Sequence, residues 1–565
     1  MPRPRISRKA VLILLLLGAS VPYFVNLGVS SIWDANEAFY AQAPREMMAA
    51  NDYVNPSFNF QLRYNKPVLS YWEVAAAYRA FGVSEWSERL PIALGGIVLI
   101  ATAFGLGQLA GGTEAGLLAA LVLAASPRVL LLARRIIIDV HIAMFTGLVL
   151  LCFTLSEARP EKRRLYLVLM YVAAGFGVLT KGPVAVFLPA LVFVIYLASQ
   201  KRLGDVRRMM LPLGAVIGLA IVAPWYYFVY RDHGPAYIKA FIVGENLGRY
   251  AEAVGEQSRG VLFYIPVMLT DLFPWSLLIP VALWWAFRRR ANNVLRLLLT
   301  WVAAIVVFFS FSGTKEDLYI LPIVTAEAAL IGAMIAASWP EKGARHLFVE
   351  DSQKGAGLLF QAAPRAYALL ATAATFAFAG IVMVWAFSLS HRFSLQGAAF
   401  IGGAAVVGGV VSAVAAARGR SFGAAAAIAG TVTVISWCIV LCSLPDFERY
   451  KPVKPFAAII RSRASEGGIV GYYDFALPSM VFYLNRPVME VVMPDHLRAA
   501  FYSSGDVHFV IPEADYLQIK DRLPAQTYVL ARQPMFDLRA KNFLGGLELP
   551  QFLLISNRPG DSRSQ

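Results

Sequence analysis

The chain has 565 residues, of which 58% are hydrophobic and 15% are charged, and its formal net charge is +15. Soluble globular chains carry about 45–50% apolar and about 25% charged residues. The composition therefore excludes a soluble enzyme, a disordered scaffold and a small disulfide-linked secreted domain. We interpret the positive charge as loop charge that orients spans in a membrane, rather than as a surface for nucleic acid.

Apolar stretches long enough to cross a bilayer recur along the chain. Crossing a hydrocarbon core of roughly 30 Å takes about 20 mainly apolar residues, and this window predicts about thirteen transmembrane helices. We expect the first to be an uncleaved helix, since it has no small-residue cleavage site. The predicted spans lie near residues 10–30, 90–110, 115–133, 136–155, 165–180, 183–199, 209–229, 261–287, 294–312, 318–338, 365–389, 394–417 and 422–444.

Basic residues fall in alternate loops. The N-terminus is basic, and so are the loops near 159–164, 201–208, 288–290 and 418–420. Because cytoplasmic loops carry the excess of Lys and Arg, we expect a cytoplasmic N-terminus. An odd number of spans then puts the tail after Pro445 outside the cytoplasm.

The tail differs in composition from the rest. It is polar, with short alternating apolar runs near 468–473, 507–511 and 527–530 and helix-like pieces near 453–466 and 512–522. This pattern is typical of a small α/β domain. We therefore divide the chain into a helical membrane domain, residues 1–444, and an extracytoplasmic α/β domain, residues 445–565.

The first outer loop, residues 31–89, carries candidate catalytic acids. Its apolar spacing predicts short interfacial helices over Asn36–Ala49 and Val68–Phe81. Asp34 and Glu37 are three residues apart and share a face if this stretch is helical. A carboxylate here can deprotonate a hydroxyl group or orient a sugar. The alternative is that both residues merely solvate a loop or cap a helix.

Asp139 is a further candidate acid, because it opens an otherwise apolar run just after Arg135. A carboxylate at the membrane is costly and marks a functional site by default. The alternative is an Arg135–Asp139 ion pair at helical spacing.

Basic residues on the predicted outer side break the charge bias of the loops. Converging cations suit a phosphate head group, although each side chain alone could simply extend to the interface. No ATP-binding or zinc motif stands in a supporting context, so we expect an already activated substrate, no cofactor and no metal. The cations are Lys66, Lys181, Arg249 and Lys315.

Several short motifs, in this order and spacing, resemble the bacterial members of the dolichyl-phosphate-mannose–protein mannosyltransferase superfamily. These are polyprenyl-phosphate-dependent GT-C glycosyltransferases, and the transferase that adds aminoarabinose to lipid A is one branch. The motifs are Asn36-Glu37-Ala-Phe-Tyr40, Asn65-Lys66-Pro67, Arg135 through Asp139, Thr180 through Pro183, Glu245 through Tyr250, and Lys315 through Pro322.

The resemblance implies roles for these residues. The family has a catalytic Asp where this chain has Asn36, and an amide cannot act as a base. The role passes to Asp34 or Glu37, or Asn36 only orients a sugar. Asp139 matches the second acidic position of the family. Lys66 and Arg249 match positions that hold the polyprenyl phosphate.

Asn65 and Asn246 depart from the aminoarabinose branch, which has Glu and His there, so no metal site is expected. The resemblance predicts inverting transfer of a monosaccharide from undecaprenyl phosphate to a hydroxyl of a lipid, glycan or protein, on the periplasmic side of the bacterial inner membrane. Alternatives within this class are protein O-mannosylation and aminoarabinose transfer to lipid A. Alternatives outside the glycosyltransferases are a lipid-linked-sugar transporter and a non-catalytic assembly protein. Further residues expected to contact the substrate are Tyr40, Lys181, Lys315 and Tyr319.

Overall fold

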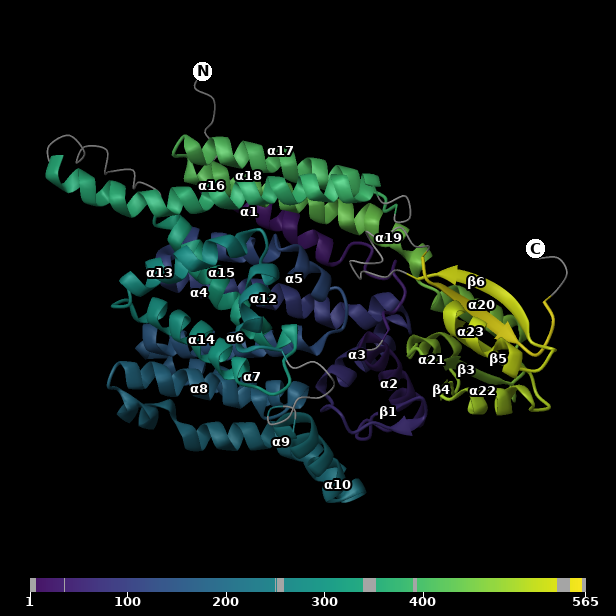
Figure 1. Cartoon of the computed structure of the whole chain (residues 1–565). Coiled ribbons are helices and arrows are strands. Elements are labelled where there is room, and N and C mark those ends of the chain that lie inside the picture. Colours follow the sequence, from purple (N-terminus) through teal and green to yellow (C-terminus); the bar gives the residue numbers. More distant parts are fainter. Residues whose placement is uncertain are drawn as a thin grey trace.

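The computed structural model describes residues 7–34, 36–248, 250, 259–338, 352–389, 394–535 and 549–560. Helices form one large body, and an α/β region lies at one end of it (Figure 1). Within the described residues, nine helices are long and apolar enough to span a membrane. A tenth is added if the bent pair Val261–Asp271 and Trp275–Arg288, which meet at 118°, is one span. The expected multi-span helical fold is confirmed.

Each predicted span coincides with a helix, although several helices are shorter than a full crossing. The N-terminal helix α1 covers Arg8–Ser20, and α8 covers Val184–Ser199. Helix α4, Glu85–Ala124, is interrupted at Gly111 and Gly112, so it supplies two predicted spans. Gly112 has φ +84°, which glycine adopts without the steric cost of a Cβ. The number thirteen stays a prediction.

The first outer loop contains the two expected helices. Helix α2 covers Asn36–Ala50 and α3 covers Leu69–Phe81. Between them lies a short hairpin of β1, Ser57–Phe58, and β2, Gln61–Leu62. Most of α2 is buried rather than lying on an open interface.

The remaining helices of the body complete the bundle (Figure 1). They are α5 Pro127–Leu132, α6 Ile138–Ala158, α7 Arg163–Lys181, α9 Leu211–His233, α10 Pro235–Ile238, α12 Tyr264–Asp271, α13 Ile279–Arg288, α14 Asn293–Ser310, α15 Val324–Ala336, α16 Ser352–Leu389, α17 Ala398–Ala417, α18 Ser421–Cys438 and α19 Leu444–Phe447.

Helices α16, α17 and α18 pack with α1 as a layer along one side of the body (Figure 1). Small residues let their backbones approach closely. A Cβ added at Gly409 of α17 would lie 2.7 Å from the backbone oxygen of Ala373 in α16. One added at Gly408 would collide with Thr431 of α18.

The carboxyl-terminal region contains a five-stranded sheet in the order β4-β3-β5-β7-β6. Strands β4, β3 and β5 are parallel, and β7 and β6 add to them in antiparallel fashion. The predicted small α/β fold of the tail is confirmed. Its elements are α20 Val453–Arg463, β3 Ile469–Tyr473, α21 Ser479–Leu484, β4 Met489–Val491, α22 Pro494–Phe501, β5 Val507–Pro512, α23 Glu513–Ile519, β6 Tyr528–Pro534 and β7 Gln551–Ser556.

The α/β region holds the start of the first outer loop. The amide of Ile32 donates to the Tyr483 hydroxyl at 2.7 Å, and the amide of Ser31 donates to Glu448 at 2.9 Å. Arg45 of α2 donates to the backbone oxygen of Phe482 at 3.0 Å. These bonds fix the segment that leads into α2.

Candidate functional site

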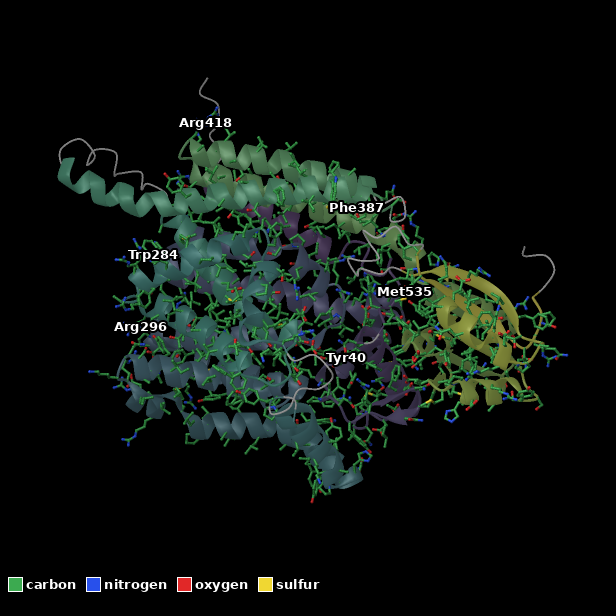
Figure 2. All side chains as sticks on the ribbon, in the orientation of Figure 1. Tyr40, Trp284, Arg296, Phe387, Arg418 and Met535 are labelled. Atoms are coloured by element: carbon green, nitrogen blue, oxygen red, sulfur yellow. The ribbon has the colours of Figure 1, made fainter. Side chains whose placement is uncertain are left out.

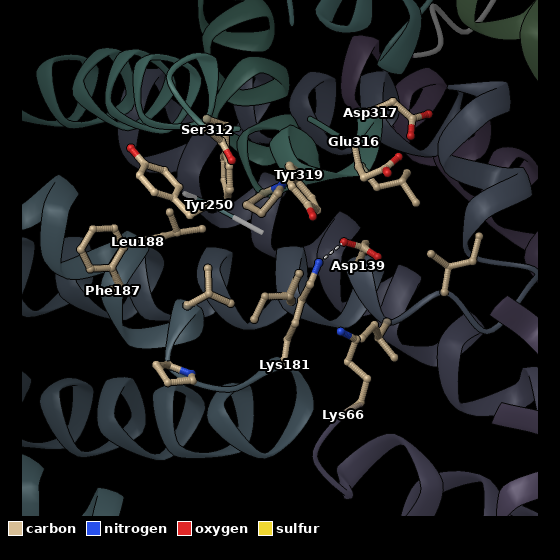
Figure 3. A pocket seen from close by; sticks show the side chains of 18 of the residues that line it. Lys66, Asp139, Lys181, Phe187, Leu188, Tyr250, Ser312, Glu316, Asp317 and Tyr319 are labelled. Atoms are coloured by element: carbon tan, nitrogen blue, oxygen red, sulfur yellow. Dashed lines mark hydrogen bonds and ion pairs between the residues drawn. The ribbon is translucent and has the colours of Figure 1, made fainter. Parts of the chain in front are cut away.

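Segments far apart in the sequence enclose a cavity of about 750 Å³. They are the start of α2, the loop before α3, the start of α6, the end of α7, the start of α8, Tyr250, the end of α14 and the segment that follows it. Figure 3 shows polar side chains converging from several of these segments. Of the predicted site residues, those that line the cavity are Asn36, Tyr40, Lys66, Asp139, Lys181 and Tyr319.

Asp139 and Lys181 form an ion pair in this cavity (Figure 3). Asp139 lies in the first turn of α6 and Lys181 in the last turn of α7. A carboxylate near a helix N-terminus and an ammonium near a C-terminus are both favoured by the helix dipole. Gly182 ends α7 at φ +82°, where a Cβ would lie 2.6 Å from the Phe241 ring, so only glycine fits there.

Lys66 reaches toward this pair from the loop between β2 and α3 (Figure 3). The Tyr237 hydroxyl donates to the Lys66 backbone oxygen at 2.8 Å and fixes the loop. Tyr40 stacks on Tyr71 with ring centroids 5.2 Å apart and is buried, and Figure 2 labels it on the side of the helical body nearer the α/β region. Lys66 and Lys181, two of the cations predicted to hold a phosphate, thus line the same cavity.

Asp139 pairs with Lys181 rather than with Arg135, the partner that helical spacing offered. The Arg135 guanidinium lies 4.8 Å from the centre of the Trp33 ring instead. Helical spacing fails here because α6 begins only at Ile138, so Arg135 lies outside the helix that carries Asp139.

One side of the cavity is apolar. Phe187 and Leu188 of α8 and Phe308 of α14 line it. Ligand cavities combine mainly apolar walls with a few convergent polar groups. This cavity therefore suits an amphipathic molecule with an anionic head and a hydrocarbon chain.

The segment after α14 adds polar groups that sequence reasoning missed. Glu316 and Asp317 line the cavity and are about half exposed, at 50% and 46%. Asp317 pairs with Arg128 at 2.5 Å. Tyr319, which was predicted, lies with its ring 5.4 Å from the Lys181 ammonium. The position of both acids directly after Lys315 in a predicted outer loop was a signal that could have found them.

Two further polar lining residues, Tyr250 and Ser312, were also missed. Tyr250 ends the motif Glu245 through Tyr250, so that motif was a signal for it, whereas nothing in the sequence separates Ser312 from other residues of outer loops.

Lys315 does not line the cavity. Its ammonium donates to the backbone oxygen of Ser312 at 2.7 Å, and the side chain is 9% exposed. It therefore shapes the loop after α14 from within. Arg249, the other predicted phosphate ligand, lies outside the described residues.

Glu37 also lies away from the cavity, buried in an ion pair with Arg89. Both side chains are 2% exposed, and Arg89 donates to the two carboxylate oxygens at 2.8 and 3.0 Å. The Trp33 amide donates to the same carboxylate at 2.7 Å. These contacts hold Glu37 inside the protein, outside the cavity that Asn36 and Tyr40 line.

Asp34 is held by the α/β region, since its carboxylate accepts a hydrogen bond from the Ser479 amide at 2.8 Å. Burial raises the pKa of Asp34 from its ordinary 3.8 to about 6. A carboxyl group with this pKa could act as a base near neutral pH, but it does not line the cavity.

Replacing Asp34 by Asn is expected to stabilise the protein at pH 8 and to do so less as the pH falls toward 4. The folded state binds a proton more tightly than the unfolded state, so wild-type stability falls as pH rises from 3.8 to 6. The gain at pH 8 is roughly 1–3 kcal/mol. Thermal unfolding midpoints of both proteins at pH 4.5, 6 and 8 would measure it. A difference in unfolding midpoint between the two proteins that does not change with pH would contradict the raised pKa of Asp34.

Comparison with known proteins shows what this chain is similar to. Residues 65–228 match the family model described as dolichyl-phosphate-mannose-protein mannosyltransferase. An uncharacterized protein of Aquifex aeolicus is 29% identical over 319 residues, 56% of this chain and 62% of that protein. The undecaprenyl phosphate-alpha-4-amino-4-deoxy-L-arabinose arabinosyl transferase 1 of Pseudomonas fluorescens is 30% identical over 331 residues, 58% of this chain and 60% of that protein. The chain thus spans about three fifths of the length of these relatives.

Solved structures match over nearly the whole chain. The crystal structure of ArnT from Cupriavidus metallidurans bound to undecaprenyl phosphate has a TM-score of 0.76 and 24% identity, and covers 97% of this chain and 98% of that one. The same protein in the apo state gives a TM-score of 0.74 and 23% identity, with 97% of each chain covered. The chain is therefore a multi-pass membrane protein with the GT-C fold of ArnT, and the resemblance predicted from its motifs, to an aminoarabinose-transferase-like GT-C protein, is confirmed.

Proposed function

We propose that the chain is a glycosyltransferase that moves a monosaccharide from a polyprenyl phosphate, undecaprenyl phosphate, to an acceptor on the periplasmic side of the bacterial inner membrane. The observation that carries this proposal is the cavity in which Lys66, Lys181 and Asp139 converge beside an apolar wall. Cations, a carboxylate and a hydrocarbon surface are what a lipid-linked sugar phosphate requires.

The donor phosphate would bind Lys66 and Lys181, and Arg249 where it reaches the site. Its isoprenoid chain would run along Phe187, Leu188 and Phe308. An incoming phosphate shares the ammonium of Lys181 and so loosens the ion pair with Asp139. Donor binding would thereby free the carboxylate that the reaction needs.

In the reaction, an acceptor hydroxyl oxygen attacks the anomeric carbon while the bond from that carbon to the phosphate oxygen breaks. The two lysines stabilise the charge that grows on the leaving lipid phosphate, which is worth roughly 2.7–4 kcal/mol for a well-positioned donor. Asp139 takes the proton of the hydroxyl. A single displacement inverts the anomeric configuration. Of the three acids predicted as catalytic, Asp139 lines the cavity, which supports it over Asp34 and Glu37 as the base.

Asn36 and Tyr40 would contact the sugar, and Glu316 and Asp317 across the cavity offer acceptors for its hydroxyl or amino groups (Figure 3). The relatives in Pseudomonas are named for 4-amino-4-deoxy-L-arabinose. We therefore propose an amino sugar or pentose as the first candidate donor, and a lipid as the first candidate acceptor.

The proposed orientation is a cytoplasmic N-terminus with the α/β region, within residues 445–565, in the periplasm. Segments predicted to be outer loops meet at the cavity, including residues 31–89, 180–183 and 312–318. Figure 2 labels Arg296 and Arg418 on the side of the helical body opposite the α/β region, which agrees with basic residues inside.

Replacing Lys66 or Lys181 by Ala is expected to weaken donor binding by roughly tenfold to a hundredfold, because a hydrogen bond to a charged group contributes about 1.5–3 kcal/mol. Equilibrium binding of undecaprenyl phosphate to the purified chain would measure the change. Lys201→Ala, at an exposed loop on the predicted cytoplasmic side, is the matched control. Equal binding in all variants would refute the phosphate site. Binding without any sugar product from lipid-linked sugars would favour a transporter.

A further inference from the structure

A second cavity, of about 480 Å³, lies between the layer of α16–α18 and the segment that leads into the first outer loop. Phe376 and Met383 of α16, Ile401 of α17 and Ile435 of α18 line it, together with Trp33 of the loop. Its volume is within the roughly 300–1,000 Å³ of small-molecule sites. The walls are hydrocarbon on the helix side, so they fit acyl chains better than a polar solute.

Two arginines stand at the polar end of this cavity. Arg134 donates to the backbone oxygens of Val25 at 2.7 Å and Asn26 at 2.9 Å, and also to that of Pro22. Arg135 lies against the Trp33 ring. Within the described part of the chain, neither arginine forms an ion pair with a carboxylate. Arg89 lines the same cavity but is paired with Glu37. Glu37 acts on Arg135 only at longer range. Arg134 and Arg135 are thus two positive charges at an apolar cavity without an ion-pair partner among the described residues.

An anion at this end would complete the arrangement. Guanidinium groups match phosphate through parallel hydrogen bonds, and Asn26 and Ser30 line the same cavity with further polar atoms. A molecule that supplies both hydrocarbon and phosphate is a phospholipid or a phosphorylated glycolipid.

The two cavities meet at one short segment of the chain. Trp33 lines the second cavity and Asn36, three residues later, lines the first. Arg135 lines the second cavity and not the first, so a phosphate bound there would be separate from the proposed donor. The second site is distinct from the donor site but next to it.

We propose that the second cavity binds an anionic lipid with a phosphomonoester head, whose acyl chain lies against α16–α18 and whose phosphate pairs with Arg135 and Arg134. Occupancy would hold Trp33 and hence the segment that carries Asn36. The proposal concerns binding alone, so it can fail or succeed independently of sugar transfer.

The test measures binding of radiolabelled phosphatidic acid to the purified full chain in neutral detergent. Diacylglycerol with the same acyl chains lacks only the phosphate, and it is expected to bind roughly tenfold or more weakly. Arg135→Gln is expected to weaken phosphatidic acid by a similar factor, with partial recovery in Arg135→Lys. Ala379→Phe, which fills the cavity from α16, is expected to abolish binding.

Matched controls are Arg159→Gln, an exposed arginine, and Ala371→Phe, an exposed position on the same helix α16. Both are expected to bind phosphatidic acid as the wild type does. Equal affinity for the two lipids, or full binding by Ala379→Phe, would overturn the proposal. So would a loss of phosphatidic acid binding in Lys66→Ala, because the probe would then occupy the first cavity.

Competition then distinguishes the two sources of this head group. A phosphorylated glycolipid that displaces phosphatidic acid at lower concentration would assign the cavity to a glycolipid substrate. Displacement only by ordinary anionic phospholipids would assign it to a bound membrane lipid.

Discussion

Replacing Asp139 by Asn is expected to lower the rate constant of sugar transfer by about 10²–10⁴-fold, the usual contribution of a general base. The amide is nearly the same size as the carboxylate but cannot accept the proton of the acceptor hydroxyl. Loss of the negative charge also leaves Lys181 without its partner. Donor affinity should therefore stay the same or rise while turnover falls.

The measurement is single-turnover transfer from a lipid-linked sugar, with donor binding measured in parallel. Asp34→Asn makes the same chemical change at an acid outside the cavity and is the matched comparison. We expect its effect on turnover to be far smaller. If Asp34→Asn abolished transfer while Asp139→Asn did not, the base would be Asp34 and the loop would have to rearrange when substrate binds. A product with retained anomeric configuration would rule out single displacement in either case.

Much of the helical body follows from composition and periodicity. Long apolar runs fix where spans lie, because a bilayer sets their length. The convergence of Lys66, Asp139 and Lys181 also followed from the sequence, since alternate basic loops put all of these residues on the same predicted side. The ion pair between Asp139 and Lys181 could not be predicted from the sequence. Asp139 and Lys181 are 42 residues apart and meet only because α6 and α7 are antiparallel neighbours.

The position of Glu37 shows why the other contacts of the candidate site residues could not be predicted. Its spacing from Asp34 suggested a shared catalytic face, yet its partner is Arg89, 52 residues later at the start of α4. No periodic pattern links those positions. The contacts of the tail with the first outer loop could not be predicted either. Short alternating apolar runs predict the strands of the tail. The hydrogen bonds that Tyr483 and Ser479 form with the first loop span more than 440 residues and depend on tertiary packing.

Replacing Arg89 by Ala is expected to lower the free energy of unfolding by about 3–5 kcal/mol, because it leaves the buried carboxylate of Glu37 without its ion-pair partner. Arg89 holds both oxygens of Glu37 and also donates to the backbone oxygens of Leu27, Ser30 and Ser31. Those carbonyls belong to the segment that ends at Asn36 in the first cavity. Donor binding should therefore weaken as well, although Arg89 does not line that cavity.

A paired replacement separates the two contributions of Arg89. Arg89→Met combined with Glu37→Leu removes both charges, and we expect it to recover most of the stability, since buried ion pairs are often matched by apolar residues of similar volume. Arg208→Ala, which breaks an exposed pair with Asp205, should cost no more than about 1 kcal/mol. Unfolding midpoints and undecaprenyl phosphate binding would be measured on all three. Stability recovered without binding would show that Arg89 positions the loop through its carbonyl contacts; an Arg89→Ala protein as stable as Arg208→Ala would contradict the buried pair.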